Sequence, residues 1–190
     1  EYAIWLEYAK SLGHRRIWLS VNSAHSRRNY REALRKIPGL EVTGIGPIPG
    51  RTEFEFAEYP AERFLELPPA KRPTLIHNSG QFCCGFATAL APHGIAVPRD
   101  VSLLAYSDTE MGRHYNPPLS SFSQDFYEIG RTGAQVLAEI IEQNLSGEAA
   151  IARTDREPVE STLVERASVR RRQPPDADNW KMLLCLIRAA

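Results

Sequence analysis

The chain has 190 residues, of which 43% are hydrophobic and 24% are charged, and its 23 Lys and Arg residues balance 23 Asp and Glu residues to a formal net charge of zero. This is ordinary globular composition, and it excludes an intrinsically disordered, collagen-like or coiled-coil chain. A compact chain of this length buries roughly 70% of its unfolded surface, enough for one large domain or two small ones.

The first part of the chain alternates helical and strand-like patterns. Apolar residues at helical spacing predict a helix over residues 3–12 that ends at Gly13, and a short β-prone run follows at 17–21. The polar stretch 22–26 can cap the next helix, whose apolar face stops at Pro38–Gly39. The remaining elements of this part are a strand at 40–45, a loop at 46–50, a helix at 56–67, a strand at 74–77, a helix at 82–92 and a strand at 101–106.

This alternation predicts the fold class. Nearly continuous apolar strands joined by helical connections indicate an α/β domain with a doubly wound parallel sheet covered on both faces. Ligands of such sheets bind beyond the carboxyl ends of the strands. We therefore expect the functional residues in three segments, 22–28, 77–81 and 107–116.

The pattern changes after Pro117–Pro118. The sequence predicts an extended segment at 120–125, a long helix at 127–144, a loop through 147–158 and a strand at 161–166. The long helix carries an apolar stripe made of Ile129, Val136, Leu137, Ile140 and Ile141. Such a stripe has to be covered, so we expect self-association or mobility of residues 126–158.

Cysteines and motifs restrict the chemistry. Cys83, Cys84 and Cys185 are odd in number and two are adjacent, which indicates reduced thiols in the cytoplasm rather than disulfides or a zinc site. No nucleotide-binding loop, nucleophile elbow or metal-ligand spacing is present, so we expect no metal and no cofactor. The three histidines on predicted turns are interpreted as solvated: His14, His25 and His114.

Charge and hydropathy restrict the partners. The neutral charge argues against non-specific nucleic-acid binding, and no apolar run approaches the roughly 20 residues that span a membrane. The start of the chain lacks the layout of a secretory signal, although a leader before Glu1 stays open. One basic cluster is interpreted as a solvated linker, with a phosphate-binding arm as the alternative: Arg166, Arg170, Arg171 and Arg172.

Three stretches of sequence, in this order, resemble one family: GIAVPRDVSLLAYSDTE at 94–110, YNPPLSSFSQDFYEIG at 115–130 and STLVERAS at 161–168. They are similar to the effector-binding region of LacI/GalR-type transcriptional regulators, and SLGHRRIWLS at 11–20 and NYREALRK at 29–36 resemble the same region. The resemblance covers about residues 3–168.

The resemblance implies a periplasmic-binding-protein-like fold of type I, with two α/β lobes and a small molecule, often a sugar or nucleobase, between them. Residues 1–119 would form the second lobe, 120–168 the crossover strands and a first-lobe helix, and 169–190 a tail outside the match. Most of the first lobe would precede residue 1. The protein would act as a homodimer and bind operator DNA only through an amino-terminal helix-turn-helix that this chain does not contain.

The resemblance also points to ligand-binding positions. The Asn-Asp pair that binds sugar hydroxyls in the family corresponds to Ser79 and Gly80, and of the two acids after the fourth strand only Asp108 remains, preceded by Ser107. Arg27 or Arg28 lies near the family's arginine. Phe126 matches an aromatic residue that stacks on ligand in some members.

Two interpretations of these departures stay open. Either the cleft recognises a different ligand, or it has lost sugar recognition. The ligand-binding candidates are Ser79, Ser107, Asp108, Phe126 and Arg27.

The sequence therefore predicts the ligand-sensing and dimerising domain of a transcriptional regulator. The alternative is a solute-binding protein of an uptake system, which shares the fold. An enzyme ranks third, because Cys83 and Cys84 beside His77 are better explained as core packing. The apolar tail from Trp180 to Ala190 is expected to dock as a helix rather than stay disordered.

Overall fold

The computed structural model describes residues 2–47, 50–155 and 159–172. The chain divides into two compact units, of which unit 1 comprises residues 1–122 and 163–190 and unit 2 comprises residues 123–162. The prediction for the tail at 180–190 falls outside the described residues. The proposed lobe boundaries at residues 119 and 168 stay predictions.

A six-stranded sheet with the order β2-β1-β3-β4-β5-β6 forms the centre of unit 1. The four neighbouring pairs from β2 to β5 are all parallel, which confirms the predicted parallel sheet. The strands are β1 (Arg16–Ser20), β2 (Glu41–Ile45), β3 (Leu75–Asn78), β4 (Ser102–Ala105), β5 (Ser120–Gln124) and β6 (Ser161–Val164).

Burial separates the central strands from the edge. Every residue of β3 and β4 is buried, as expected for strands covered on both faces. In β2 no residue is fully buried, although its sequence resembles the others. The reason is its position, because β2 has a neighbouring strand on one side only.

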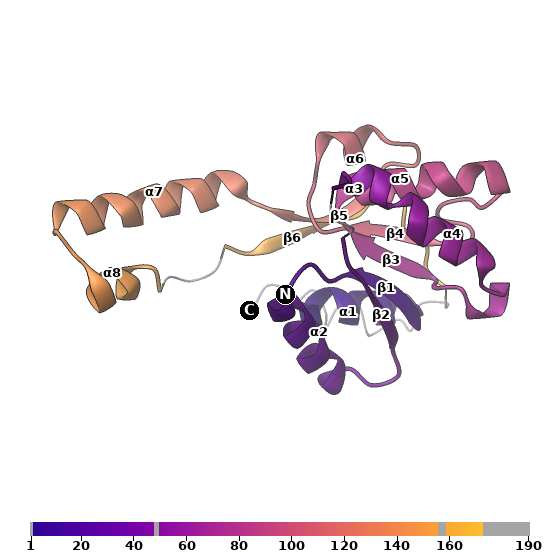
Figure 1. Cartoon of the computed structure of the whole chain (residues 1–190), viewed down its shortest axis with the longest axis horizontal. Helices are drawn as coiled ribbons and strands as arrows, with labels where there is room; N and C mark the ends of the chain where they lie inside the picture. The colour runs from indigo at the N-terminus through magenta and orange to yellow at the C-terminus, as the bar shows by residue number, and fades with distance from the viewer. Residues whose placement is uncertain (1, 48–49, 156–158, 173–190) are drawn as a thin grey trace. The chain divides into compact units, whose positions relative to one another are not determined.

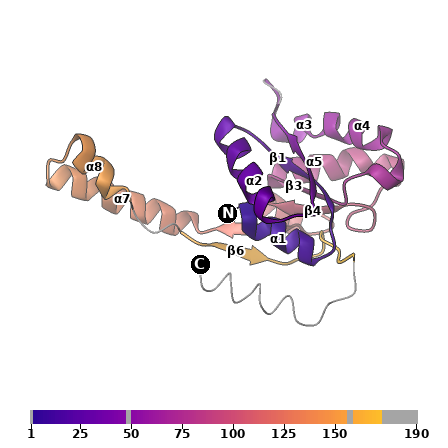
Figure 2. The ribbon, with the colours of Figure 1, turned by 90° about the horizontal axis from the view of Figure 1, so that it is seen from below.

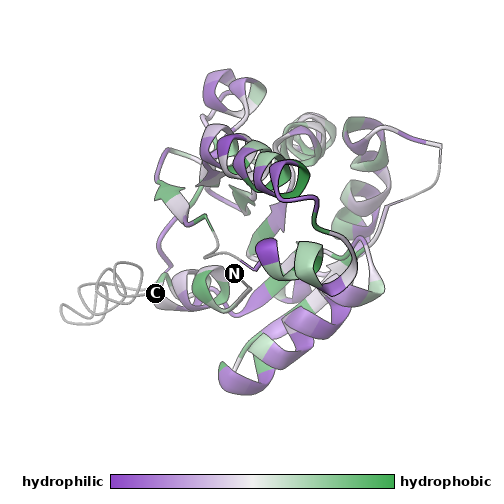
Figure 3. Ribbon diagram, turned by 90° about the vertical axis from the view of Figure 1, so that its left-hand side faces the viewer, coloured by the Kyte–Doolittle hydropathy of each residue, from purple (hydrophilic) through white to green (hydrophobic). Residues whose placement is uncertain are grey.

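Helices cover both faces of this sheet. Figure 1 shows α1 (Tyr2–Ser11) and α2 (Ala24–Lys36) on one side of the strands and α3 (Glu53–Phe56), α4 (Glu58–Glu66) and α5 (Gly80–Leu90) on the other. Figure 2 shows β1, β3 and β4 side by side. The helices in Figure 3 carry both hydrophobic and hydrophilic residues, as expected when one face packs on a sheet.

Two cores result from this layering. The first lies under α3, α4 and α5 and contains Phe64, Phe82 and Phe86. The second lies under α1 and α2 and contains Leu6 and Leu19. Cys83 and Cys84 are buried in the first core, which confirms their interpretation as packing residues.

Helix ends follow local capping signals. Ser23 is the N-cap of α2 and forms a capping box with Ser26, as the polar stretch predicts. Gly13, just beyond α1, has a φ of 85°, the left-handed conformation that glycine adopts readily.

The prediction of one helix at 56–67 is wrong in its extent. Thr52 and Glu55 form a capping box that starts α3 earlier, and Ala57 separates α3 from α4. Two further helices, α6 (Glu110–His114) and α8 (Gly147–Arg153), lie in segments predicted as loops. Both are too short to show helical periodicity in the sequence.

Two other interpretations from sequence are wrong. His14 is fully buried rather than solvated, with Nδ1 3.0 Å from Thr74 Oγ1 and Nε2 3.0 Å from the Arg170 carbonyl oxygen. The basic cluster is exposed at Arg170, Arg171 and Arg172, but it is not a linker, because the segment is part of unit 1 and is hydrogen-bonded to its other residues. The Arg172 amide donates to Leu12 (2.7 Å) and its guanidinium to the carbonyl of Asp100 (2.7 Å).

Unit 2 is a helical pair, α7 (Phe126–Glu142) and α8, with an ion pair of 3.7 Å between Arg153 and Glu139. Val136 is the one buried residue of α7 among those described. Leu137 and Ile141 are 57% and 68% exposed, so much of the predicted apolar stripe faces outward. A hollow of about 370 Å³ lies along it, lined by Thr132, Gly133, Val136, Leu137, Ile140 and Thr154. Self-association through this stripe stays a prediction.

Candidate functional site

The candidate site lies at the edge of the sheet where the strands of unit 1 end. Because β1, β3 and β4 run parallel, the segments that follow them meet at one edge, as the sequence predicts. The strand order reverses between β1 and β3, since β1 connects outward to β2 and β3 connects to β4. Such a reversal is where open α/β sheets form a binding crevice.

Ser79 lies at this edge of the sheet, and its hydroxyl stabilises the start of a helix. It is the N-cap of α5, where its Oγ accepts a hydrogen bond from the Phe82 amide at 3.1 Å. Its own amide donates to Oδ1 of Asn78 at 2.8 Å. Both residues are buried, so Ser79 fixes the start of α5.

Gly80 shows why the acid expected from the family resemblance is missing. A Cβ atom at Gly80 would lie 2.5 Å from Oγ1 of Thr109, closer than side chains approach. Thr109 is itself held as the N-cap of α6, where Oγ1 accepts from the Gly112 amide at 3.2 Å. A side chain at position 80 would therefore require the Thr109 side chain, which caps α6, to shift.

A chain of polar contacts extends from Ser79 across the edge. The hydroxyl of Tyr106, at the end of β4, donates to Oε1 of Glu53 at 3.3 Å and also has a hydrogen bond with Ser79. Burial, followed by the negative charge of Glu53, raises the pKa of Tyr106 to about 12. Tyr106 is therefore a neutral hydroxyl that joins the ends of three elements, α3, β3 and β4.

Asp108 is held by two arginines. Its side chain is 9% exposed, and its two oxygens accept from the Arg166 guanidinium at 2.7 and 3.0 Å. Arg113 adds a contact of 3.1 Å. The Arg166 hydrogen bonds lower the pKa of Asp108, so the carboxylate stays ionised. Ser107, one residue earlier, is partly exposed.

Aromatic rings enclose His77 at the end of β3. Its ring lies 4.0 Å from the Trp5 ring and 6.2 Å from that of Tyr106, between centroids. Nδ1 is 2.9 Å from the Leu104 carbonyl oxygen, and burial lowers the pKa of His77 to about 4. Burial also raises the pKa of the neighbouring Cys83 thiol. A neutral imidazole beside a protonated thiol has the character of core packing.

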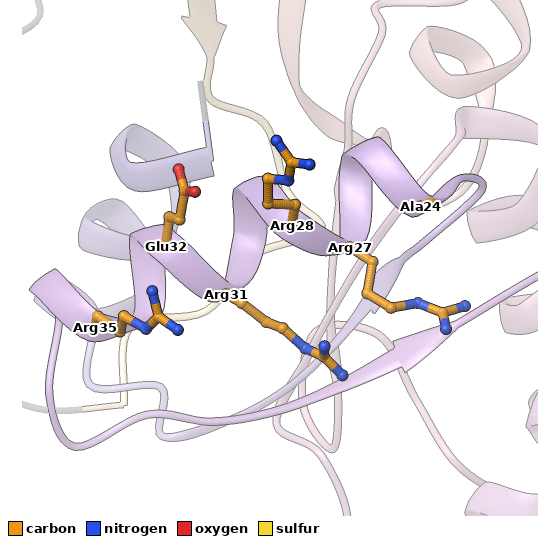
Figure 4. A pocket seen from close by; sticks show the side chains of 6 residues that line it. All are labelled: Ala24, Arg27, Arg28, Arg31, Glu32 and Arg35. Carbon is orange, nitrogen blue, oxygen red and sulfur yellow. The ribbon is translucent and has the colours of Figure 1, made fainter.

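The last two candidates lie elsewhere. Arg27 projects from α2 into a hollow of about 400 Å³ (Figure 4), and among the described residues no ion pair joins it to Asp108. The hollow is lined by Ala24, Arg27, Arg28, Arg31, Glu32 and Arg35. Phe126 begins α7 in unit 2, where it is 62% exposed.

Sequence reasoning missed the contact residues that connect distant segments. Glu53 and Tyr106 are 53 residues apart, and Asp108 and Arg166 are 58 apart. The one available signal was Arg166, which lies inside the LVER stretch used for the family resemblance.

Within residues 2–47, 50–155 and 159–172, no group of three or more His, Cys, Asp or Glu residues could hold a metal ion. No helix in the same ranges is long and apolar enough to cross a membrane.

Residues 6–169 match the family model of the periplasmic binding protein-like domain. Over 110 residues the chain is 33% identical to the HTH-type transcriptional repressor PurR of Haemophilus influenzae, an alignment that covers 55% of this chain and 30% of that protein. Over 81 residues it is 32% identical to the ribose operon repressor of the same organism, covering 40% of this chain and 23% of that protein. The chain thus spans less than a third of the length of these relatives.

Solved structures show the same fold. A LacI family transcriptional regulator from Bifidobacterium animalis subsp. lactis superposes with a TM-score of 0.71 at 22% identity, covering 89% of this chain and 60% of that one. A LacI family regulator from Lactobacillus casei with bound sucrose gives 0.70 at 20% identity, covering 88% and 62%. A dimeric Lac repressor with an 11-residue C-terminal deletion gives 0.69 at 22% identity, covering 89% and 60%.

Proposed function

The chain belongs to the periplasmic binding protein-like domain family, and from this premise we propose that it is the ligand-sensing and dimerising part of a DNA-binding transcriptional regulator. The expected LacI/GalR-type effector-binding fold is confirmed by the family match and the structural neighbours. The match over residues 6–169 is the observation that carries the proposal. Relatives named as repressors favour it over a solute-binding protein of an uptake system.

The effector is proposed to be a sugar or a related metabolite bound at the carboxyl edge of unit 1. The Tyr106 hydroxyl contacts the Glu53 carboxylate there, and Ser107, the next residue in the chain, is partly exposed. Hydroxyl and carboxylate groups bind polyhydroxylated ligands. Ser79 and Asp108 already have protein partners, so they position this edge. Phe126, in unit 2, and Arg27, on α2, stay predictions as ligand-binding residues.

The polar groups that remain at this edge bear on the two interpretations of the site. An edge that keeps the Glu53 carboxylate and the Tyr106 hydroxyl retains groups that can bind a polar ligand, although the acid of the family at position 80 is absent. We therefore favour an altered ligand over a lost one. The named relatives are regulators rather than enzymes, and we propose that this domain has no catalytic activity.

The remaining partners follow from the same premise. The regulator would act in the cytoplasm as a homodimer, and a helix-turn-helix outside this chain would bind operator DNA. Closure of the domain on its effector would then change the spacing of the DNA-binding heads.

Titration calorimetry of the full-length regulator against a panel of sugars and nucleobases tests the proposal. We expect saturable binding by one class, weakened at least about tenfold by Ser107→Ala, since a lost hydrogen bond to a polar ligand costs about 1 to 3 kcal/mol. The control Ser146→Ala changes a serine of unit 2. The absence of binding by every compound would contradict effector sensing, and equal binding by Ser107→Ala would contradict the location of the site.

A further inference from the structure

Helix α2 concentrates positive charge in a chain whose formal net charge is zero. Five of its 13 residues are basic and one is acidic, which gives the helix a net charge of +4. All six of these charged side chains are exposed. The outer face of α2 therefore attracts anions.

Four of the basic residues line the hollow of about 400 Å³ on this helix. Its lining consists of Ala24, Arg27, Arg28, Arg31, Glu32 and Arg35. No ion pair joins any of the four arginines to another residue within the described part of the chain. In Figure 4, Glu32 extends from the same side of the helix as Arg28, and Arg27 and Arg31 extend from the other side. One carboxylate cannot neutralise four guanidinium groups, so the hollow keeps a positive charge.

The spacing of the arginines suits a ligand with repeated negative charges. Arg27, Arg31 and Arg35 are four residues apart, so they recur at intervals of about 6 Å and span about 12 Å of the helix. Like charges at this spacing destabilise a helix, and a bound anion would relieve that repulsion. The planar guanidinium group donates hydrogen bonds in a fork that matches the oxygens of a phosphate group.

The geometry also restricts the class of anion. An exposed ion pair contributes little, so a single phosphate group held by one or two arginines would bind weakly. A molecule with several phosphate groups can contact arginines on successive turns at once. The volume of the hollow is within the range of roughly 300 to 1,000 Å³ that is typical of small-molecule sites. Single-stranded nucleic acid fits less well, because the lining contains no aromatic residue on which a base could stack.

We propose that the outer face of α2 binds a small anion with several phosphate groups, either an inorganic polyphosphate or a nucleoside polyphosphate. This ligand site is additional to the proposed effector site, since Glu53, Tyr106 and Ser107 do not line the hollow. Arg27 is the one lining residue that is also a predicted effector contact. The test therefore leaves Arg27 unaltered.

Titration calorimetry with tripolyphosphate tests the site in the full-length protein that contains this chain. Arg31→Ala with Arg35→Ala should raise the dissociation constant about tenfold, as expected for two lost charged contacts at an exposed site. Arg31→Lys with Arg35→Lys keeps the charges but removes the forks, so its affinity should be intermediate. The matched control, Arg51→Ala with Arg63→Ala, removes two exposed arginines outside the hollow and should leave the dissociation constant unchanged. Binding elsewhere in the protein is common to every variant, so the differences report on α2.

Two further ligands distinguish the sources of phosphate. Orthophosphate should bind at least about tenfold more weakly than tripolyphosphate, because it has one phosphate group. Adenosine triphosphate that binds more tightly than tripolyphosphate would identify a nucleotide as the ligand, and equal binding would show that the phosphate chain alone is recognised.

Thermal unfolding gives a second readout. Tripolyphosphate should raise the Tm of the unaltered protein more than that of Arg31→Ala with Arg35→Ala, because a ligand stabilises the state that binds it. Without ligand this variant should be at least as stable as the unaltered protein, since its helix has less repulsion between like charges.

Three results would overturn the proposal. An unchanged dissociation constant in Arg31→Ala with Arg35→Ala, or an equal rise in the control, would show that tripolyphosphate binds by general attraction or elsewhere. Orthophosphate that binds as tightly as tripolyphosphate would contradict a site for several phosphate groups. If the alanine changes weaken binding of random-sequence DNA and leave tripolyphosphate binding intact, α2 contacts nucleic acid instead.

Discussion

The carboxylate of Asp108 accepts two hydrogen bonds from the guanidinium of Arg166, at 2.7 and 3.0 Å, across 58 residues of sequence. Arg166 also donates to the carbonyl oxygen of Leu119 at 2.8 Å, and its amide donates to Oγ of Ser120 at 2.9 Å. The pair therefore fixes the segment after β6 against the ends of β4 and β5. A residue expected to bind ligand thus holds together the edge on which ligand is proposed to bind.

Replacing Asp108 by Asn should lower the free energy of unfolding by about 2 to 3 kcal/mol, because it leaves the guanidinium of Arg166 largely buried without its counter-charge. Urea denaturation measures the change. Asp155→Asn, in unit 2, is the control, since Asp155 is exposed and has no ion pair among the described residues. A loss below about 0.5 kcal/mol for Asp108→Asn, the range of ordinary surface changes, would show that the pair contributes little.

Replacing Gly80 by Ala should destabilise the fold by about 1 to 2 kcal/mol, because the new methyl group would lie 2.5 Å from Thr109 Oγ1 and overpack the contact between α5 and α6. Gly133→Ala in α7 is the matched control. Nothing lies within 4 Å of a Cβ there, so that change should stabilise the helix by about 0.5 to 1 kcal/mol. Opposite signs in thermal unfolding support the packing argument, whereas equal gains would contradict it.

Stability should fall as the pH is lowered from about 6.5 towards 4, and His14 should contribute to this fall. Burial lowers the pKa of His14 to about 4 in the folded chain, so between these pH values the unfolded chain binds a proton that the folded chain does not. Stability therefore rises with pH in this window, by up to about 1.4 kcal/mol per pH unit for each such histidine. His77, with a pKa of about 4, adds a second contribution.

Urea unfolding at several pH values measures this slope. His14→Gln should reduce it relative to the unaltered chain, even if the variant is less stable at every pH. The exposed His25 serves as the control, because His25→Gln should leave the slope unchanged. An unchanged slope in His14→Gln would contradict the assignment.

The thiols of Cys83 and Cys84 should resist alkylation in the native state. Both side chains are buried, and burial raises the pKa of Cys84 to about 11 and also raises that of Cys83. Few thiolates therefore exist at neutral pH. In a Cys185→Ser background, iodoacetamide labelling followed by mass spectrometry should detect reaction only after unfolding. Rapid native labelling of either residue would reopen the enzyme hypothesis.

Amide hydrogen exchange should be faster in α7 than in α5. In α7 Val136 is the one described residue that is buried, whereas most of α5 lies in the first core. Helices with few buried contacts open at low free-energy cost. Mass-spectrometric exchange at low and high protein concentration measures both helices. Protection of α7 that grows with concentration would indicate that self-association covers Leu137 and Ile141.

Most secondary structure was predictable because its signals are local. The polar stretch before α2, the glycine after α1 and the apolar runs of β1, β3 and β4 each act within a few residues, and all are found where the sequence indicates. Prediction failed for α6 and α8, whose five and seven residues are fewer than the roughly 11 residues over which helical periodicity can be recognised.

The candidate site was predictable only in part. Its place at the carboxyl edge follows from strand order and parallel direction, which alternating strands and helices imply. The hydrogen-bond partners of its residues cannot be predicted from strand order. Ser79 and Asp108 form hydrogen bonds with partners that the sequence does not reveal. The prediction that His14 is solvated was wrong for the same reason, because its ring contacts Thr74 and Arg170, which are distant in the sequence.

The sequence by itself determined the order of the elements, the parallel sheet and the family, because hydrophobic periodicity and short motifs are properties of adjacent residues. Only the tertiary structure decided that β2 is an exposed edge, that Gly80 has no room for an acid, and that Arg166 neutralises Asp108. Burial and ion pairing depend on which distant segments come together. The spacing of residues along the chain does not show which distant residues are close in space.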